Sequence, residues 1–228
     1  MHLHLFSSPG ERDIRYILEA SRPYLVTHPH PTVAYLPAAA VGHNWLDYTE
    51  KAFQDLAAIA LVDVENMARV DIESILDRAA LIYISGGNTF LLNHRLHQSG
   101  VIHLLRQKVV EGLPVVAFSA GTTLCGPNVL TSNDMNICET TFFSALNLEP
   151  FNFSVHYPAD EPTRTEWDEW LREYHAFHSN SILALEDGAY LRFQSPDAIV
   201  LRGNCWLLAK GQVRQKVESG APLQASGG

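Results

Sequence analysis

The sequence has few cysteines and no long run of like charges. Its 228 residues include three cysteines, Cys125, Cys138 and Cys205, which lie far apart and form no Cys-x-x-Cys spacing. This scarcity argues against a disulfide framework and against a zinc cluster. The 16 Lys and Arg residues are scattered and the net charge is −9, so we expect neither a nucleic-acid partner nor an anionic membrane surface. A small molecule or a peptide is the expected partner.

The sequence also lacks a long apolar stretch. No segment reaches the length of a membrane span, and the first residues lack the basic flank and apolar core of a signal peptide. We therefore expect a cytoplasmic location. Hydrophobic residues make up 46% of the chain, which is enough to build a sizeable core. We predict one domain over residues 1–219 and a flexible polar tail over 220–228.

Strands and helices alternate through about the first 125 residues. Apolar runs predict strands over 2–6, 32–36, 59–63, 80–85 and 114–118. Helical spacing predicts helices over 12–21, after Asn44, over 71–78, from 90 onward and over 101–111. Because these strands are apolar on both faces, we predict a three-layer α/β/α domain with a doubly wound, mostly parallel sheet. From Leu183 onward, short β runs between turn residues predict an antiparallel C-terminal extension of the same domain.

A turn of small residues follows the apolar run at 114–118. The turn holds Ser119, with Ala120 and Gly121 directly after it. This layout predicts a nucleophile elbow, although Ala117 stands where the Gly-x-Ser-x-Gly pattern has its first glycine. In such an elbow the amide of Ala120 lies at a helix N-terminus and faces a developing oxyanion. The alternative is a buried strand that ends in an ordinary Ser-Ala-Gly turn.

A second glycine turn precedes a helix at Gly86-Gly87-Asn88-Thr89. It follows the predicted strand 80–85, so it lies at the sheet edge where ligands bind in folds of this kind. Glycine turns present bare backbone amides. Gly86 and Gly87 are therefore candidate oxyanion donors beside Ser119, and the alternative is a tight turn with no chemical role.

A serine nucleophile needs a base, and the chain has 11 histidines. Two pairs lie one helical turn apart: His94 with His97, and His175 with His178. No added carboxylate supports a metal site there, so we interpret both pairs as solvated helix faces. His156 differs, because it follows a strand-like run at 151–155 and should lie at the end of that strand. It is the candidate base, with a hydrogen-bonded structural histidine as the alternative.

Two acidic residues compete to orient such a histidine. Asp134 lies in a polar segment between the serine and the histidine, where it could also cap its own loop. Asp187 lies in the turn Leu185-Glu186-Asp187-Gly188, where the plain interpretation is a hairpin corner. The residues alone leave this choice open.

Several segments together resemble the aspartyl dipeptidase (dipeptidase E) family. They are Asn44-Trp45 with Asp47-Tyr48-Thr49, Ser85-Gly-Gly-Asn-Thr-Phe90, Phe118-Ser119-Ala-Gly121, Thr131-Ser-Asn-Asp134-Met, Ala145-Leu-Asn-Leu148 and His156. The resemblance covers nearly the whole chain, in the same order and at similar spacing. Cyanophycinases are a more distant comparison. The chain departs from the family at Ala117 and at Ser85, where family members often have glycine.

The resemblance implies a flavodoxin-like sheet, similar to that of class I glutamine amidotransferases, and a serine triad. Ser119 is the implied nucleophile, His156 the base and Asp134 the favoured acid. Asp187 is the alternative acid, because the glycine after it places it in register with a Pro-Glu-Gly turn that has also been proposed for this role, although this chain departs from that turn with Leu185-Glu186-Asp187-Gly188. The resemblance implies no metal and no organic cofactor.

Substrate selection is the last role that the resemblance implies. Thr163-Arg164 matches a Thr-Arg pair whose arginine is understood to bind the aspartyl side chain of the substrate, and we expect Asn88 to contact the substrate as well. Without the resemblance, Arg164 would be interpreted as a surface residue paired with Glu161 or Glu166. Arg192 or Arg202 could also take the role.

Together these features predict a serine exopeptidase that cleaves short peptides with an N-terminal aspartate. The alternatives are another serine acyl hydrolase, such as an esterase or a cyanophycinase-like peptidase, and a small-molecule sensor without turnover. The expected partner is a small peptide, with no nucleic acid and no membrane, and a homodimer is left open.

Overall fold

A computed structural model describes residues 1–8, 14–42, 45–194, 197–220 and 222–223. Its helices are α1 (Arg15–Leu25), α2 (Leu46–Phe53), α3 (Arg69–Arg78), α4 (Thr89–Gln98), α5 (Val101–Val110), α6 (Ala120–Leu124) and α7 (Glu161–Phe177). Its strands are β1 (His2–Phe6), β2 (Thr32–Leu36), β3 (Ala58–Leu61), β4 (Leu81–Ile84), β5 (Val115–Phe118), β6 (Asn152–Ser154), β7 (Ile182–Leu185), β8 (Tyr190–Gln194), β9 (Asp197–Arg202), β10 (Cys205–Leu208) and β11 (Gln215–Val217).

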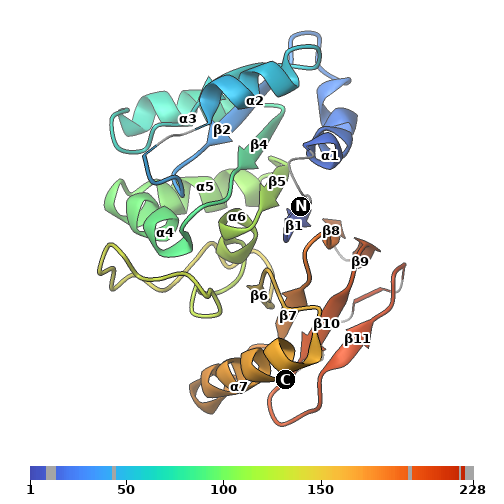
Figure 1. Ribbon diagram of the computed structural model, residues 1–228. Coiled ribbons are helices and arrows are strands. Elements are labelled where there is room, and N and C mark those ends of the chain that lie inside the picture. Colours follow the sequence, from blue (N-terminus) through green and yellow to red (C-terminus); the bar gives the residue numbers. More distant parts are fainter. Residues whose placement is uncertain (9–13, 43–44, 195–196, 221, 224–228) are drawn as a thin grey trace.

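The main sheet has seven strands in the order β3-β2-β4-β5-β1-β8-β9. The first five are parallel, and β8 and β9 continue the sheet as antiparallel strands. The carboxyl ends of β1, β4 and β5 therefore meet at one edge. The mostly parallel sheet with helices on both sides confirms the predicted fold class (Figure 1).

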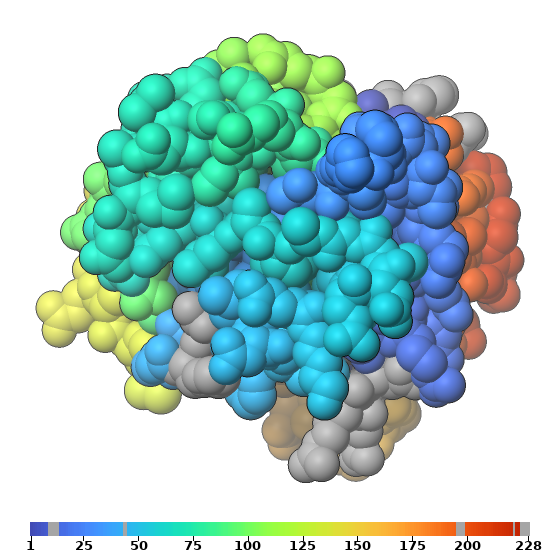
Figure 2. All heavy atoms as spheres, turned by 90° about the horizontal axis from the view of Figure 1, so that it is seen from above, coloured from blue at the N-terminus to red at the C-terminus, as the bar shows by residue number. Residues whose placement is uncertain are grey.

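The main sheet buries both of its faces, as its continuously apolar strands require. In β2, Val33 and Tyr35 face a core shared with α1 and α2, whereas Ala34 and Leu36 face the opposite core, which receives α3 to α6. Residues of α1, α2 and α3, coloured blue to green, form much of the surface seen from above (Figure 2). The alternation of side chains along each strand thus produces the three layers.

A second sheet differs from the prediction of one antiparallel extension. Only β8 and β9 extend the main sheet, while β11-β10-β7-β6 form a separate four-stranded sheet. In β7, Leu183 and Leu185 face the central core, and Ile182 and Ala184 face α7. Because β7 is apolar on both faces, it needs a layer on each side, and α7 supplies the outer one (Figure 1).

The element boundaries mostly agree with the sequence. The helix expected over 12–21 begins at Arg15 and continues to Leu25, whose side chain is buried against the main sheet. Residues 9–13, Asn44 and 224–228 lie outside the described residues, so the expected helix start, the cap at Asn44 and most of the expected tail are not tested.

Candidate active site

Ser119 directly follows β5, at the carboxyl edge of the main sheet. Its backbone has φ 52° and ψ −117°, a conformation that non-glycine residues seldom adopt. The Ser119 amide donates to the Phe6 carbonyl oxygen at 2.9 Å, which ties the turn to β1. The strained strand-to-helix turn is the geometry that the sequence predicts for a nucleophile elbow.

Two glycines let the chain pass close to this turn. A Cβ atom on Gly121 would lie 2.6 Å from the Ile84 carbonyl oxygen. A Cβ atom on Gly86 would lie 2.6 Å from a ring carbon of Phe118 and 3.0 Å from the Ser119 Cβ. The two distances of 2.6 Å are too short for a real Cβ atom, so the contact between β4 and the Ser119 turn requires glycine at both positions.

Backbone amides are available beside Ser119. The Ala120 amide lies at the N-terminus of α6. In the described part of the chain, no backbone carbonyl accepts a hydrogen bond from the amide of Gly86 or of Gly87. Gly87 itself has φ 141° and packs so closely on Ala39 that a Cβ atom would lie 2.3 Å from the Ala39 carbonyl oxygen. These amides can therefore point toward a ligand, as the oxyanion prediction requires.

His156 lies beyond β6 and connects Ser119 to an acid. Its Nε2 is 2.9 Å from the Ser119 Oγ, and its Nδ1 is 2.6 Å from the Asp187 Oδ1. An ionised carboxylate can only accept, so the Nδ1 of a neutral His156 carries the proton and the Nε2 is left to accept the serine proton. The three side chains thus form the proton-transfer arrangement of a serine hydrolase.

The acid beside His156 is Asp187 and not Asp134, the acid that the family resemblance favours. The Asp134 Oδ2 accepts hydrogen bonds from the Thr89 amide at 2.7 Å and from the Ser132 Oγ at 3.1 Å. Asp134 therefore satisfies an amide at the N-terminus of α4 and holds its own loop there.

Asn88, expected to contact the substrate, is a helix cap in the structure. Its Oδ1 accepts from the Leu91 amide at 2.9 Å and its Nδ2 donates to the Met135 carbonyl oxygen at 2.9 Å. Both ends of the amide thus make contacts within the protein.

Arg164, expected to select the substrate, lies in the first turns of α7 and is 7% exposed. Its Nη2 donates to the Glu186 Oε1 at 2.8 Å and its Nε donates to the Pro158 carbonyl oxygen at 2.8 Å. The alternative partner named from the sequence, Glu161, accepts from the Nη1 at 3.1 Å. Arg164 is therefore a buried, paired residue rather than a free cation.

Sequence reasoning missed Ser7, which is fully buried at the end of β1. Its Oγ accepts a hydrogen bond from the His156 amide at 2.8 Å and lies 3.4 Å from the Asp187 Oδ1. This contact supports the backbone of His156, which has φ 57°. The available signal was its position directly after a strand that ends at the same sheet edge as Ser119.

The remaining histidines and cysteines form no metal site among the described residues. The His97 ring stacks on Phe142, and the His178 ring stacks on Tyr174. The three cysteines are free thiols, and burial raises the pKa of the Cys205 thiol to about 12. Within the described residues, no helix is long and apolar enough to cross a membrane.

The chain matches a known protein family. A model of peptidase family S51 matches residues 5–201. The chain belongs to peptidase family S51. This membership confirms the resemblance to dipeptidase E and, with the names of the relatives below, supports a serine peptidase.

Curated relatives of this S51 chain carry peptidase names. Peptidase E of Streptomyces coelicolor is 32% identical over 198 residues, which cover 84% of this chain and 80% of that protein. A Drosophila melanogaster protein named "Probable alpha-aspartyl dipeptidase" is 35% identical over 179 residues, which cover 75% of this chain and 72% of that protein. Peptidase E of a Nostoc species is 37% identical, but the match spans about half of its length, 52%.

A solved structure shares the fold. The crystal structure of a peptidase from an acI-B1 Actinobacterium gives a TM-score of 0.70 and covers 98% of this chain and 96% of that chain. Its sequence identity is 15%, so this likeness shows the fold alone.

Proposed function

We propose that the chain is a serine exopeptidase that hydrolyses dipeptides through Ser119, His156 and Asp187. The observation that carries this proposal is the continuous hydrogen-bonded line from the Ser119 Oγ through both ring nitrogens of His156 to Asp187. Ser119 itself lies on a strained elbow at the carboxyl edge of a mostly parallel sheet, where folds of this kind bind ligands.

The chemistry follows from this line. His156 Nε2 takes the Ser119 proton as the Oγ attacks the peptide carbonyl carbon, and the resulting imidazolium is stabilised by Asp187. The Ala120 amide and an amide of Gly86 or Gly87 stabilise the oxyanion. His156 then protonates the leaving amine, and a water molecule activated by His156 hydrolyses the acyl-enzyme.

Substrates with an N-terminal aspartate are the first to test, because a relative carries the name "Probable alpha-aspartyl dipeptidase". The donors of Arg164 are mostly engaged within the protein, so an aspartate preference would need another group to carry it. The cytoplasmic location, the small-peptide partner and the homodimer that the sequence left open remain proposals.

The test is a hydrolysis screen of Asp-Xaa, Glu-Xaa and Asn-Xaa dipeptides beside simple esters. Wild-type protein should release amino acids from dipeptides and should react stoichiometrically with a fluorophosphonate at Ser119, whereas Ser119→Ala should do neither. Hydrolysis of esters alone would favour the other acyl hydrolases. A folded wild-type protein that leaves Ser119 unlabelled would favour a sensor without turnover.

A further inference from the structure

A buried ion pair lies directly beside the triad acid. Glu186 precedes Asp187, and its Oε1 accepts from the Arg164 Nη2 at 2.8 Å, with both side chains 9% exposed. The same oxygen accepts from the Trp206 Nε1 at 2.9 Å, and the Oε2 accepts from the Asn204 Nδ2 at 2.8 Å. Three donors fix both oxygens of this carboxylate, so the backbone that leads into Asp187 is fixed as well.

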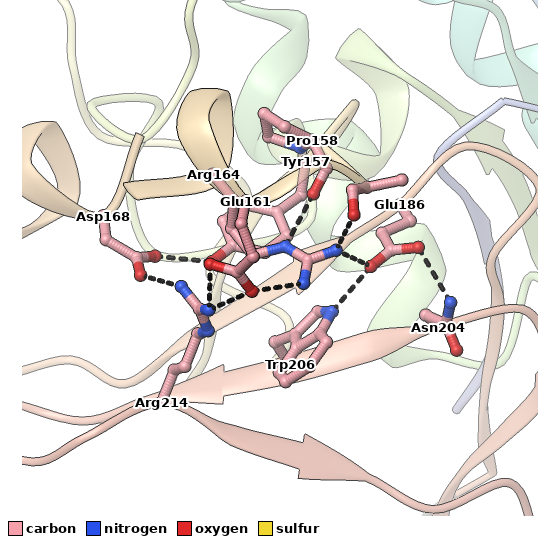
Figure 3. Close-up of polar contacts among 10 residues, drawn as sticks. Tyr157, Pro158, Glu161, Arg164, Asp168, Glu186, Asn204, Trp206 and Arg214 are labelled. Carbon is pink, nitrogen blue, oxygen red and sulfur yellow. Dashed lines mark hydrogen bonds and ion pairs between the residues drawn. The ribbon is translucent and has the colours of Figure 1, made fainter. Parts of the chain in front are cut away.

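Arg164 also holds the segment that follows the base. Its Nε and Nη2 donate to the carbonyl oxygens of Pro158 and Ala159, at 2.8 and 2.5 Å. The guanidinium lies over the Trp206 ring, with 4.8 Å between its central carbon and the ring centroid. One planar cation therefore joins the chain just after His156 to the chain just before Asp187 (Figure 3).

A second arginine extends this connection. Arg214 donates to Glu161 at 2.7 and 2.9 Å and also pairs with Asp168. The Asp168 Oδ1 in turn accepts from the Tyr157 hydroxyl at 2.5 Å, and Tyr157 directly follows His156. Since Glu161 also accepts from Arg164, charged contacts run without interruption from the neighbour of the base to the neighbour of the acid (Figure 3).

We propose that Arg164 and Glu186 are positioning residues that hold Asp187 in hydrogen-bonding distance of His156, and that Arg164 does not bind the substrate. This inference rests on the proposed function of the triad. To bind Arg164, a substrate carboxylate would have to replace Glu186 as its partner. The buried Glu186 carboxylate would then lack a cation, which is strongly unfavourable. The side chain of Asp187, in contrast, is 64% exposed, and the buried Ser7 Oγ contacts it only at 3.4 Å, a long hydrogen bond.

The experiment places Arg164→Met and Glu186→Gln in the wild-type protein and in an Asp187→Asn background. For each protein, kcat and KM are measured on Asp-Leu and Asn-Leu, together with the rate at which a fluorophosphonate labels Ser119. Arg164→Lys keeps the positive charge but not the planar fork, and it provides a conservative variant in case Arg164→Met does not fold. Ile72→Ala, a core change in α3, is the control for lost stability.

We expect each single substitution to lower kcat and the labelling rate by about 100-fold, the cost of a misplaced catalytic group. KM should stay close to the wild-type value, as should the ratio of kcat/KM on Asp-Leu to kcat/KM on Asn-Leu. Arg164→Lys should recover part of the loss in kcat. In the Asp187→Asn background, the same substitutions should cost little more, because their effect passes through Asp187. Ile72→Ala should leave kcat of the folded protein unchanged.

Two results would overturn the inference. A loss confined to Asp-Leu and expressed in KM would make Arg164 a substrate-binding residue. A loss that is fully additive with Asp187→Asn, or no larger than that of Ile72→Ala, would make the pair a general stabilising contact. If wild-type protein hydrolyses no dipeptide, the proposed function fails on the peptide assay, while the labelling rates still test the positioning role.

Discussion

Ser119 and its two partners are held by different kinds of packing. Ser119 follows the main sheet, where close contacts of backbone with glycine and apolar side chains shape the turn. His156 and Asp187 lie beside the second sheet, where the buried pair of Arg164 and Glu186 links the segment after His156 to the residue before Asp187. Close steric contacts fix the first region, and charged hydrogen bonds fix the second. The first should therefore be damaged by adding a methyl group, and the second by removing a charge.

The largest expected effect tests whether the two regions act as one unit. Ser119→Ala and His156→Ala should each lower kcat by about 10⁶-fold, and the double variant should lose little more, because nucleophile and base act together. Single-turnover assays and thermal unfolding of all three proteins provide the measurement. Substantial turnover in Ser119→Ala would contradict the proposal.

The next effect separates the two acids. Asp187→Asn should lower kcat by about 10⁴-fold, since the amide keeps the size of the carboxylate but not its charge. Asp134→Asn should leave kcat near the wild-type value and lower the free energy of unfolding by about 1 kcal/mol through its contact at the start of α4. The reverse pattern in steady-state assays would restore Asp134 as the acid.

A polar exception within the main sheet gives a smaller, pH-dependent effect. His4 in β1 is 5% exposed, between the hydroxyls of Tyr190 and Tyr24. Burial, and then the nearby positive charges of Arg192 and His2, lower its pKa from 6.5 to about 4. As the pH falls, His4 is therefore protonated in the unfolded chain before it is protonated in the folded chain. The contribution of neutral His4 to the free energy of unfolding is fully present above pH 6.5 and is lost as the pH falls toward 4.

At about 1.4 kcal/mol per pKa unit, this loss amounts to at most about 3.5 kcal/mol. Urea unfolding at both ends of this pH range would measure it. His175 also has a pKa lowered by burial and adds a loss of the same sign, so the comparison must be made with His4→Gln. An equal pH dependence in the two proteins would remove His4 as the cause.

The smallest expected effect tests the close steric contacts around Ser119. Gly121→Ala would bring a methyl group to within 2.6 Å of the Ile84 carbonyl oxygen and should lower the free energy of unfolding by about 2 kcal/mol. Gly211→Ala is a comparison without a steric clash, because Gly211 has open space around it; its φ of 73° strains an alanine there through the backbone alone. A smaller loss in Gly121→Ala than in Gly211→Ala would show that the turn can relax.

Much of the main sheet and two of the three triad residues could be predicted from the sequence. The apolar run into Ser119 and the small residues after it are local signals. His156 was found because it follows a strand-like segment. The neighbours of each residue along the chain made both residues candidates, and the family resemblance assigned their roles.

The acid could not be chosen in this way, because Asp134 and Asp187 are both turn residues in polar segments. The choice depends on the parallel pairing of β6 with β7, in which Ser154 lies opposite Ala184. This register brings His156 and the Asp187 turn to the same edge of the second sheet. The pairing of Arg164 with Glu186 could not be predicted for a similar reason: α7 begins at Glu161 and packs on the second sheet, which turns the arginine toward Glu186.

Ser7 joins segments of the site that are synthesised at different times. Ser7 contacts both His156 and Asp187, and β1 pairs with β5 as well as with β8. A ribosome makes β1 and the Ser119 elbow well before it makes the strands that carry the acid, and domains fold largely as units as they emerge. Ser119 and His156 are thus synthesised before Asp187, so the hydrogen-bonded line from the Ser119 Oγ to Asp187 can form only after β7 and the turn that follows it have been made.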